Sequence, residues 1–279
     1  MRRRLDAELV RRHLFESREK AQLAIDQRRV LVAGSVAEKA SRQVDSAESI
    51  SLLGDAPRFV SRGGEKLAAA LTSFAIPVRG VVAFDAGAST GGFTDCLLQN
   101  GASQVVAVDV GYGQLHERIR ADSRVEVHER VNLRTVDVHD RFAGRQFPLV
   151  VGDLSFISLR SLAPNLRRLT ADNGDLVLLV KPQFEAGRED VSRGRGVIRD
   201  PGIWTRTLLD VASSFLSHNA TMMDVMSSPI TGADGNVEFL MWLRATASAH
   251  GPESVHAAID TVVSTVRTTT GSSVPKGFE

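Results

Sequence analysis

Cysteine is almost absent from this sequence. Cys96 is the single thiol among 279 residues. One cysteine cannot form an intramolecular disulfide, and it cannot by itself build a cysteine-based zinc site or an iron–sulfur cluster. The histidines also show no spacing typical of metal ligands, so we expect no metal site. The lack of a disulfide framework predicts a reducing compartment, the cytoplasm.

Long apolar runs are missing as well. The longest, such as 176–180, fall far short of the roughly 20 residues that span a bilayer. The chain starts with three arginines, but acids and further arginines follow them instead of the apolar stretch of a secretory signal. The sequence therefore predicts neither a membrane span nor a signal peptide.

Net charge is nearly absent too, because 34 Lys+Arg stand against 33 Asp+Glu. An even balance would argue against a polyanionic partner such as nucleic acid. The charges are uneven, however: residues 1–66 hold 14 basic and 10 acidic side chains, and residues 67–279 hold 20 and 23. A basic N-terminal part thus precedes a mildly acidic remainder. Lysine is scarce throughout, with five residues against 29 arginines.

The first fifty residues predict a small α+β module. Apolar residues recur at helical spacing from Leu5 to Leu14 and again after Ser17, which is a candidate N-cap. Short strands are expected at 30–34, around Val44 and at 50–53. The stretch 54–57 is the predicted boundary, so the expected domains are 1–58, 59–245 and a C-terminal helix with a flexible tail at 246–279.

The central part of the chain predicts a doubly wound α/β domain. Its strands are almost continuously apolar, as expected for strands covered on both faces, and helical patterns separate them. A long helix after Pro201, a strand pair at one sheet edge and a last helix with a frayed end at 268–273 follow. The expected strands are 81–84, 105–110, 124–128, 149–152, 176–180, 222–226 and 237–243, and the expected helices between the first of them are 93–99, 114–120 and 159–169.

A glycine-rich loop follows the first apolar strand. Glycines allow a ligand to approach the backbone, and the next helix offers unpaired N–H donors. The loop is not G-x-G-x-x-G, and the acid Asp85 precedes it, which suits a cationic ligand better than a pyrophosphate. One strand later, Asp109 can accept hydrogen bonds from both hydroxyls of an adenosine ribose. The expected cofactor is S-adenosylmethionine, bound by Asp85, Gly87, Ala88, Ser89, Thr90, Gly91, Gly92, Phe93, Asp109, Val110, Asn132 and Asp153.

Four ionisable residues stand where such a sheet delivers side chains to its ligand crevice: Lys66, Asp153, Lys181 and Glu238. Any one of them could be an ordinary salt-bridge partner. Two of the five lysines fall in this set, however, in a chain that otherwise uses arginine. Arginine cannot be deprotonated, whereas lysine can lose its proton at a suitable site.

Six sequence blocks follow one another in the order of a known family: 61–67, 85–94, 109–115, 153–158, 180–185 and 235–238. They resemble the TlyA (haemolysin A) family of rRNA ribose methyltransferases, which are related to the FtsJ/RrmJ-type enzymes. The resemblance covers residues 1 to about 244. The arginine-rich start resembles the alpha-L RNA-binding module of ribosomal proteins and pseudouridine synthases.

This resemblance implies a Rossmann-like class I methyltransferase fold and a catalytic tetrad of Lys66, Asp153, Lys181 and Glu238. The tetrad would methylate a ribose 2′-hydroxyl, of cytidine in ribosomal RNA, with Lys181 as general base or as stabiliser of the alkoxide. The RNA or the ribosomal subunits would be the partner, with no obligate protein partner evident. The expected RNA-binding residues are Arg3, Arg4, Arg11, Arg18, Arg28, Arg62 and Arg195.

Three alternatives remain. Base-directed methylation is disfavoured because Cys96 lies mid-helix and because Asp153-Leu154-Ser155-Phe156 differs from the Asn/Asp-Pro-Pro-aromatic motif of amino-methylating enzymes. A NAD-dependent oxidoreductase is weakened by the missing G-x-G-x-x-G. A membrane-active haemolysin, as the family's older name suggests, has no supporting apolar segment.

Overall fold

The computed structural model describes residues 2–12, 14–15, 17–53, 57–232, 234–246 and 252–271. The chain divides into two compact units, residues 1–58 and 59–279. Of the stretch expected to separate them, residues 54–56 lie outside the described ranges, as does the expected tail beyond Gly271. Within the described ranges no helix is both long and apolar enough to cross a membrane.

The smaller unit packs two helices against short strands. Helix α1 (Leu5–Arg11) ends earlier than the predicted Leu14, and α2 (Arg18–Asp26) begins after Ser17, whose Oγ accepts a hydrogen bond from the Lys20 N–H and confirms the predicted N-cap. The strands are β1 (Arg3–Arg4), β2 (Val30–Val32), β3 (Ser35–Val36), β4 (Gln43–Val44) and β5 (Ile50–Leu52). Strand β1 pairs with β4, and β2 lies between β3 and β5. The core is formed by Leu5, Leu9, Ala21, Ala24, Ile25, Val30, Val32, Ala37 and Val44.

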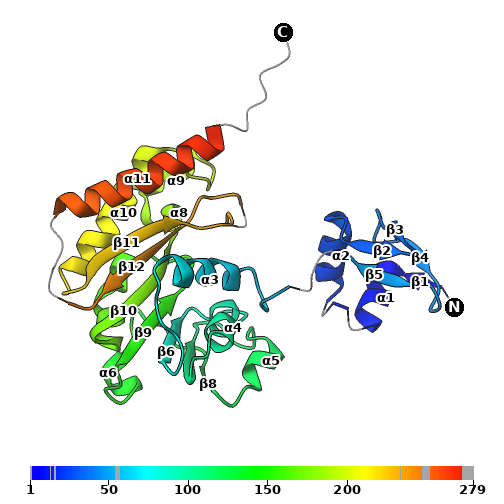
Figure 1. Ribbon diagram of the computed structural model, residues 1–279, viewed down its shortest axis with the longest axis horizontal. Helices are drawn as coiled ribbons and strands as arrows, with labels where there is room; N and C mark the ends of the chain where they lie inside the picture. The colour runs from blue at the N-terminus through cyan, green and yellow to red at the C-terminus, as the bar shows by residue number, and fades with distance from the viewer. Residues whose placement is uncertain are drawn as a thin grey trace, which may run out of the picture. The chain divides into compact units, whose positions relative to one another are not determined.

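The larger unit is built on a sheet of seven strands in the order β11-β12-β10-β9-β6-β7-β8 (Figure 1). Strands β8, β7, β6, β9 and β10 are parallel, and the edge pair β11 and β12 is antiparallel. This confirms the predicted doubly wound fold and the strand pair at one edge. The bounds are β6 (Val82–Ala86), β7 (Gln104–Val108), β8 (Val125–His128), β9 (Phe147–Gly152), β10 (Thr170–Val180), β11 (Thr221–Ser227) and β12 (Phe239–Arg244).

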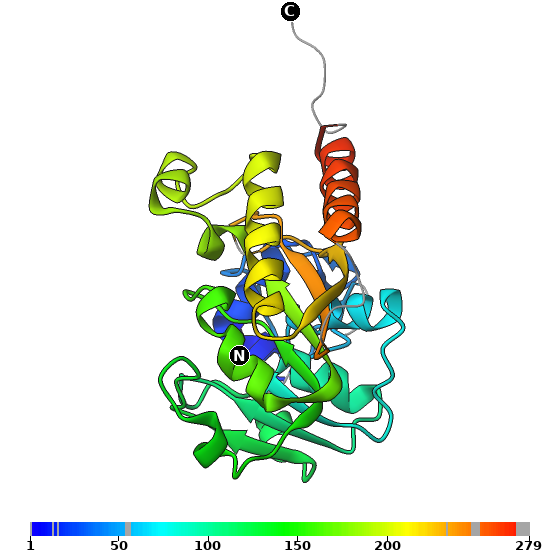
Figure 2. The same ribbon diagram turned by 90° about the vertical axis from the view of Figure 1, so that its left-hand side faces the viewer.

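Helices cover both faces of this sheet (Figure 2). Helices α3 (Gly63–Ser73), α4 (Gly92–Gln99) and α5 (Glu117–Arg120) pack on one face, and α6 (Val138–Arg141), α7 (Ala163–Leu169), α10 (Pro201–Leu216) and α11 (Pro252–Gly271) pack on the other. Two short helices, α8 (Pro182–Glu185) and α9 (Arg188–Arg193), follow β10 and were not predicted.

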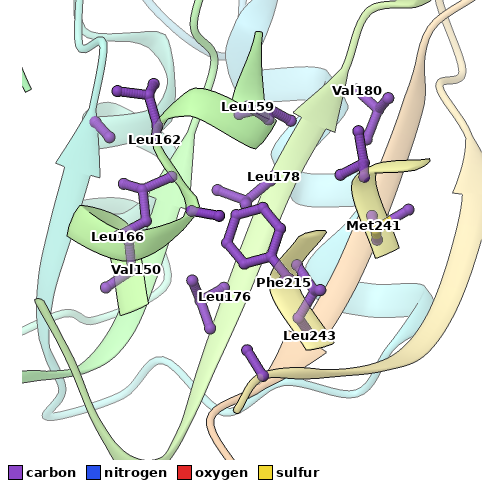
Figure 3. Close-up of a cluster of buried hydrophobic side chains, with 14 of the residues drawn as sticks. Val150, Leu159, Leu162, Leu166, Leu176, Leu178, Val180, Phe215, Met241 and Leu243 are labelled. Atoms are coloured by element: carbon purple, nitrogen blue, oxygen red, sulfur yellow. The ribbon is translucent and has the colours of Figure 1, made fainter. Parts of the chain in front are cut away.

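The apolar runs of the strands follow from this double cover. In β10, Leu176, Leu178 and Val180 point into the core beneath α7 and α10, which Figure 3 shows around Phe215. Val177 and Leu179 point into the core on the other face. Every residue of this stretch is therefore buried, which explains why it shows no polar alternation.

Three predicted helix bounds were wrong. The helix expected at 114–120 is only Glu117–Arg120, since Gln114 instead meets Ser89, whose Oγ donates to its Oε1 at 3.5 Å. The helix expected at 159–169 splits into a 3₁₀ turn and α7, because Pro164 lacks an N–H and favours the first turn of a helix. The end expected to fray from Thr268 remains helical to Gly271.

The strand order places a ligand site at one edge of the sheet. Chain order runs outward from β6 through β7 to β8, and in the opposite direction from β9 to β10. In open α/β sheets, ligands bind at the carboxyl ends of the strands where the order reverses. The reversal lies between β6 and β9, so the loops after Ala86 and Gly152 flank the expected crevice.

Candidate active site

The loop after β6 is shaped by glycines that no other residue could replace without strain. Gly87 has φ +82°, and a Cβ there would lie 3.0 Å from the carbonyl oxygen of Asp153. Gly91, the N-cap of α4, has φ +94°, and its Cβ would lie 2.9 Å from Cδ1 of Leu115. The loop therefore passes close to the β9 end and leaves its backbone accessible to a ligand.

Asp109 stands at the carboxyl end of β7, beside this loop. Its Oδ2 accepts a hydrogen bond from the Ser89 N–H at 2.8 Å, and its Oδ1 accepts one from the Gly111 N–H at 2.6 Å. A carboxylate has about four lone-pair positions, so two remain for ligand hydroxyls. The two backbone donors fix its orientation toward the cavity.

A cavity of about 520 Å³ opens between these loops. Its volume lies within the usual range for small-ligand pockets. Six of the predicted cofactor residues line it: Gly87, Ser89, Asp109, Val110, Asn132 and Asp153. A small adjoining cavity is lined by Ala88, Thr90, Gly92 and Phe93 together with Gly87, Ser89 and Asp153.

Two predicted cofactor residues line neither cavity. Gly91 caps α4 and packs on Leu115. Asp85 is fully buried beneath the loop, where its Oδ2 accepts a hydrogen bond from Thr94 Oγ1 at 2.6 Å. Its Oδ1 has no hydrogen-bond partner among the described residues. Burial raises the pKa of Asp85 to about 7, an effect that the Thr94 hydroxyl partly offsets.

These features fit S-adenosylmethionine. The glycine loop and Asp109 suit an adenosine, and the acids that line the cavity, Asp109 and Asp153, favour a cationic ligand. Among the described residues, no cluster of three or more His, Cys, Asp and Glu side chains could hold a metal ion. Asp109 and Asn132 would hold the nucleoside, and the loop from Gly87 to Phe93 would hold the methionine part.

The four predicted tetrad residues form two lysine–carboxylate pairs. Lys181 Nζ lies 2.6 Å from Asp153 Oδ1, and Lys66 Nζ lies 2.5 Å from Glu238 Oε2. Lys66 and Lys181 are each only 8% exposed and Glu238 is 3% exposed, whereas the side chain of Asp153 is 24% exposed. The Lys66–Glu238 pair is therefore buried, and the Lys181–Asp153 pair is partly buried. Such pairs interact more strongly than surface pairs because less water screens them.

A second cavity of about 480 Å³ lies next to the first. Lys66, Lys181 and Glu238 line it, whereas Asp153 lines the first cavity. Two further residues, Ser155 and Phe156, line both cavities. The Lys181–Asp153 pair thus joins the cofactor cavity to a second cavity that a substrate could enter.

The segment after β9 carries side chains that sequence reasoning missed. Phe156 is 92% exposed, has φ +63°, and its ring centroid lies 5.1 Å from that of Phe184 on α8. Ser155 Oγ accepts a hydrogen bond from Lys181 Nζ at 2.6 Å. A left-handed φ at a non-glycine residue often marks a functional site. The motif Asp153-Leu154-Ser155-Phe156 was noticed in the sequence, but only its acid was assigned a role.

Three of the predicted RNA-binding arginines of the smaller unit, Arg4, Arg11 and Arg18, are held by two buried acids. Asp6 accepts hydrogen bonds from Arg4 and Arg18, and Glu8 accepts them from Arg11 and Arg12. Both carboxylates are at most 1% exposed. The arginine side chains themselves stay partly in water, with Arg4, Arg11 and Arg18 between 44% and 54% exposed.

The remaining predicted RNA contacts are scattered. Arg28 pairs with Glu38 at 3.1 Å on the open surface, and Arg3 and Arg195 are exposed. Arg62, in the larger unit, donates to the carbonyl oxygen of Thr231 at 2.9 Å and lines the second cavity. Of the two predicted RNA contacts in the larger unit, Arg62 and Arg195, Arg62 thus lines the candidate active site.

Comparison with known proteins gives the same division of the chain. Residues 59–245 match the model of the FtsJ-like methyltransferases, and residues 3–50 match that of the S4 domain. Known relatives include TlyA of Mycobacterium tuberculosis, a 16S/23S rRNA (cytidine-2′-O)-methyltransferase, which is 45% identical over 264 residues, 92% of this chain and 97% of that protein. Hemolysin A of Brachyspira hyodysenteriae is 38% identical over 85% of this chain and 98% of its own length.

A solved structure from Streptococcus thermophilus shares the fold of nearly the whole chain. It superposes with a TM-score of 0.74 at 36% sequence identity, and the match covers 97% of this chain and 98% of the other.

Proposed function

The chain belongs to the FtsJ-like methyltransferase family, within the TlyA group, and we propose that it methylates the 2′-hydroxyl of a cytidine ribose in ribosomal RNA. One observation supports this most strongly: a close Lys181–Asp153 pair stands between the cofactor cavity and a second cavity. A ribose hydroxyl that enters the second cavity would contact the Lys181 amine on the side of the cavity that faces the cofactor.

A ribose hydroxyl is a poor nucleophile until its proton is removed. Bound S-adenosylmethionine would supply an electrophilic methyl group. Lys181 would accept the hydroxyl proton or stabilise the negative charge on the oxygen, and Asp153 would hold the amine in place. The Lys66–Glu238 pair would orient the ribose from the other side of the cavity. Burial of the two lysines and of Glu238 limits the access of water and strengthens these interactions.

The aromatic side chains at the mouth of the second cavity suit a nucleobase. An exposed aromatic ring is a stacking platform for an unstacked base, and such stacking contributes about 1–3 kcal/mol per base. Phe156 and Phe184 would hold the target base while its ribose lies at Lys181. Arg62, at the same cavity, would contact a neighbouring phosphate.

The S4-type unit would bind the ribosomal RNA around the target. Its arginines combine fixed positions with exposed guanidinium groups, which is the requirement for contacting phosphates. The proposed partner is therefore ribosomal RNA in a ribosomal subunit, the proposed compartment is the cytoplasm, and no protein partner is invoked.

The experiment that tests this proposal follows a labelled methyl group. The purified chain is incubated with methyl-labelled S-adenosylmethionine and with unmodified small or large ribosomal subunits, and the RNA is digested to nucleosides. We expect the label in 2′-O-methylcytidine. Label in a methylated base, or no transfer to either subunit, would refute the proposed reaction.

A further inference from the structure

We propose that Ser155 is a positioning residue that sets the direction of the Lys181 amine during methyl transfer. This inference rests on the proposed function, because it assigns to Ser155 a role in the same reaction. The observation behind it is that Lys181 Nζ contacts two oxygens at the same distance, 2.6 Å: Oδ1 of Asp153 and Oγ of Ser155.

The chemistry of an amine explains why the bond to Ser155 matters. A neutral lysine amine has two N–H donors and one lone pair, arranged as a tetrahedron around nitrogen. Asp153 Oδ1 is an ion-pair partner of Nζ but accepts no hydrogen bond among the described residues, so the Ser155 hydroxyl is the directional acceptor of the amine. With one N–H held by Ser155 and the nitrogen held beside the Asp153 carboxylate, the lone pair is turned away from both oxygens. That position is then available to the proton of the substrate hydroxyl.

Ser155 is suited to this role by its place. It lines the cofactor cavity and the second cavity, so it stands where a donor and an acceptor of the methyl group must meet. The lysine is 8% exposed, whereas Ser155 itself is exposed. The serine therefore adds little to the apolar core, and its contact with Lys181 is the hydrogen bond that the structure gives to its side chain.

The segment that carries Ser155 is fixed to the segment that carries Lys181 at a second point. Glu185, on α8, accepts hydrogen bonds from Ser158 Oγ at 2.5 Å and from the Leu159 N–H at 2.7 Å. Glu185 is 4% exposed, and its side chain remains bonded in spite of the burial. Two sets of hydrogen bonds thus connect the loop after β9 with the segment after β10: one between Ser155 and Lys181, the other between Ser158–Leu159 and Glu185. The second set holds Ser155 within reach of Lys181.

If Ser155 had the other conceivable role, occupying the place of the substrate, its removal would change kcat in the opposite direction. If Ser155 only occupied the place of the substrate hydroxyl, the hydroxyl would have to displace it, and removal of its Oγ would raise the rate or lower KM. If Ser155 aligns Lys181, removal of its Oγ lowers kcat and leaves KM for the RNA and the Kd for the cofactor unchanged. The two roles are therefore separated by the sign of the change in kcat.

The experiment compares variants of the full chain in steady-state methylation of ribosomal subunits. For Ser155→Ala we expect kcat to fall by about 10-fold or more, as loss of a hydrogen bond to an ionisable group implies, with KM and cofactor Kd within about twofold of wild type. Ser155→Thr keeps the hydroxyl and should restore most of kcat. The thiol of Ser155→Cys is a poorer hydrogen-bond acceptor, so the kcat of this variant should lie between those of the Ala and Thr variants. Ser161→Ala, an exposed serine of the same segment that bonds only to the Ser158 carbonyl oxygen, is the matched control and should leave kcat unchanged.

The outcomes that overturn the inference are distinct from failure of the proposed function. An Ala variant with wild-type or raised kcat would refute the positioning role, and so would a Thr variant as slow as the Ala variant. A rise confined to the KM for RNA or to the Kd for the cofactor would also refute it, because it would indicate a binding role. If the wild-type chain transfers no methyl group to a ribose, the proposed function itself fails, whatever Ser155 does.

Discussion

The two units of the chain bury acidic side chains in opposite ways. In the smaller unit, Arg4, Arg18 and Gln22 hold the pKa of Asp6 well below its usual range, and Arg11 and Arg12 lower the pKa of Glu8 to about 2. In the larger unit, burial raises the pKa of Asp85 to about 7, with only a hydroxyl as side-chain partner. The smaller unit thus uses buried acids to hold its arginines, whereas the larger unit keeps a poorly compensated acid beneath its ligand loop.

The two units also differ in which basic residue pairs with their acids: arginine in the smaller unit and lysine in the candidate site of the larger unit. In the smaller unit, Arg4 and Arg11 are fixed by bidentate contacts and stay charged, which suits binding of phosphates. The two paired lysines of the larger unit are buried, each beside one carboxylate, and a lysine can give up its proton. In the proposed reaction, arginine thus stands where the charge must be permanent and Lys181 where a proton would move.

The sharpest test of this contrast is at Lys181. Replacement by Met keeps the length of the side chain but removes the amine, so methyl transfer should fall by about 1,000-fold, the usual loss of a general base. Lys181→Arg keeps the charge but cannot accept a proton, and it should be nearly as slow. Rates are measured in single turnover, with cofactor Kd as the control. Near wild-type activity of the Arg variant would contradict the base role.

The second test removes the smaller unit. The chain that begins at residue 59 retains both apolar cores of the larger unit and the whole cofactor cavity. We expect its cofactor Kd to be unchanged and its rate on ribosomal subunits to fall by about 100-fold or more, because phosphate contacts supply much of RNA affinity. Calorimetry and methylation assays measure the two quantities. A parallel loss of cofactor binding would contradict the separation of roles.

The third test concerns pH, and the two units should respond in opposite directions. Because the pKa of Glu8 is lowered, the smaller unit should lose stability as the pH falls from about 4.5 to about 2. Because the pKa of Asp85 is raised from 3.8 to about 7, the folded state binds the extra proton, and the free energy of unfolding of the larger unit should fall as the pH rises from about 4 to about 7. That fall is at most on the order of 4 kcal/mol.

Hydrogen exchange followed by mass spectrometry reports each unit separately within the intact chain. Asp85→Asn should abolish the fall in the free energy of unfolding of the larger unit between pH 4 and pH 7. The loss of stability of the smaller unit at acid pH should remain. A decline that persists in the Asn variant would show that another group titrates.

The smallest expected effect is at Asp6. Asp6→Asn removes the charge that four side-chain hydrogen bonds share, and the smaller unit should lose about 2 kcal/mol, below the usual range for a broken buried pair because its arginines are half exposed. Glu38→Gln breaks an ion pair on the open surface and should leave the unfolding midpoint unchanged. Equal midpoints for the two variants would contradict the difference between buried and exposed acids.

The sheet could be predicted because its signal is local. Strands covered on both faces are apolar throughout, and β6 to β10 were recognised for that reason. The rarity of lysine singles out Lys66 and Lys181 in the sequence, and the family resemblance implies the full tetrad. The partners within the tetrad could not be assigned, since Lys66 and Glu238 are 172 residues apart and only the fold brings them together.

In the smaller unit, the sequence predicts the positive charge but not the contacts that position it. Counting arginines predicts a basic surface, but it cannot show that Asp6 and Glu8 are buried beneath them. Ser155 was overlooked for a similar reason: a serine in a loop has many uses, and only its distance to Lys181 Nζ distinguishes this one.

The measurement that tests the central claim most directly is a map of ribose methylation in ribosomal RNA. RNA is taken from cells that lack this protein and from the same cells supplied with the wild-type chain or with Lys181→Met, and 2′-O-methyl groups are located by their resistance to alkaline cleavage. We predict a mark at one or more cytidines with the wild-type chain and no mark with the variant. An equal mark with the variant, or a methyl group on a base, would contradict the account.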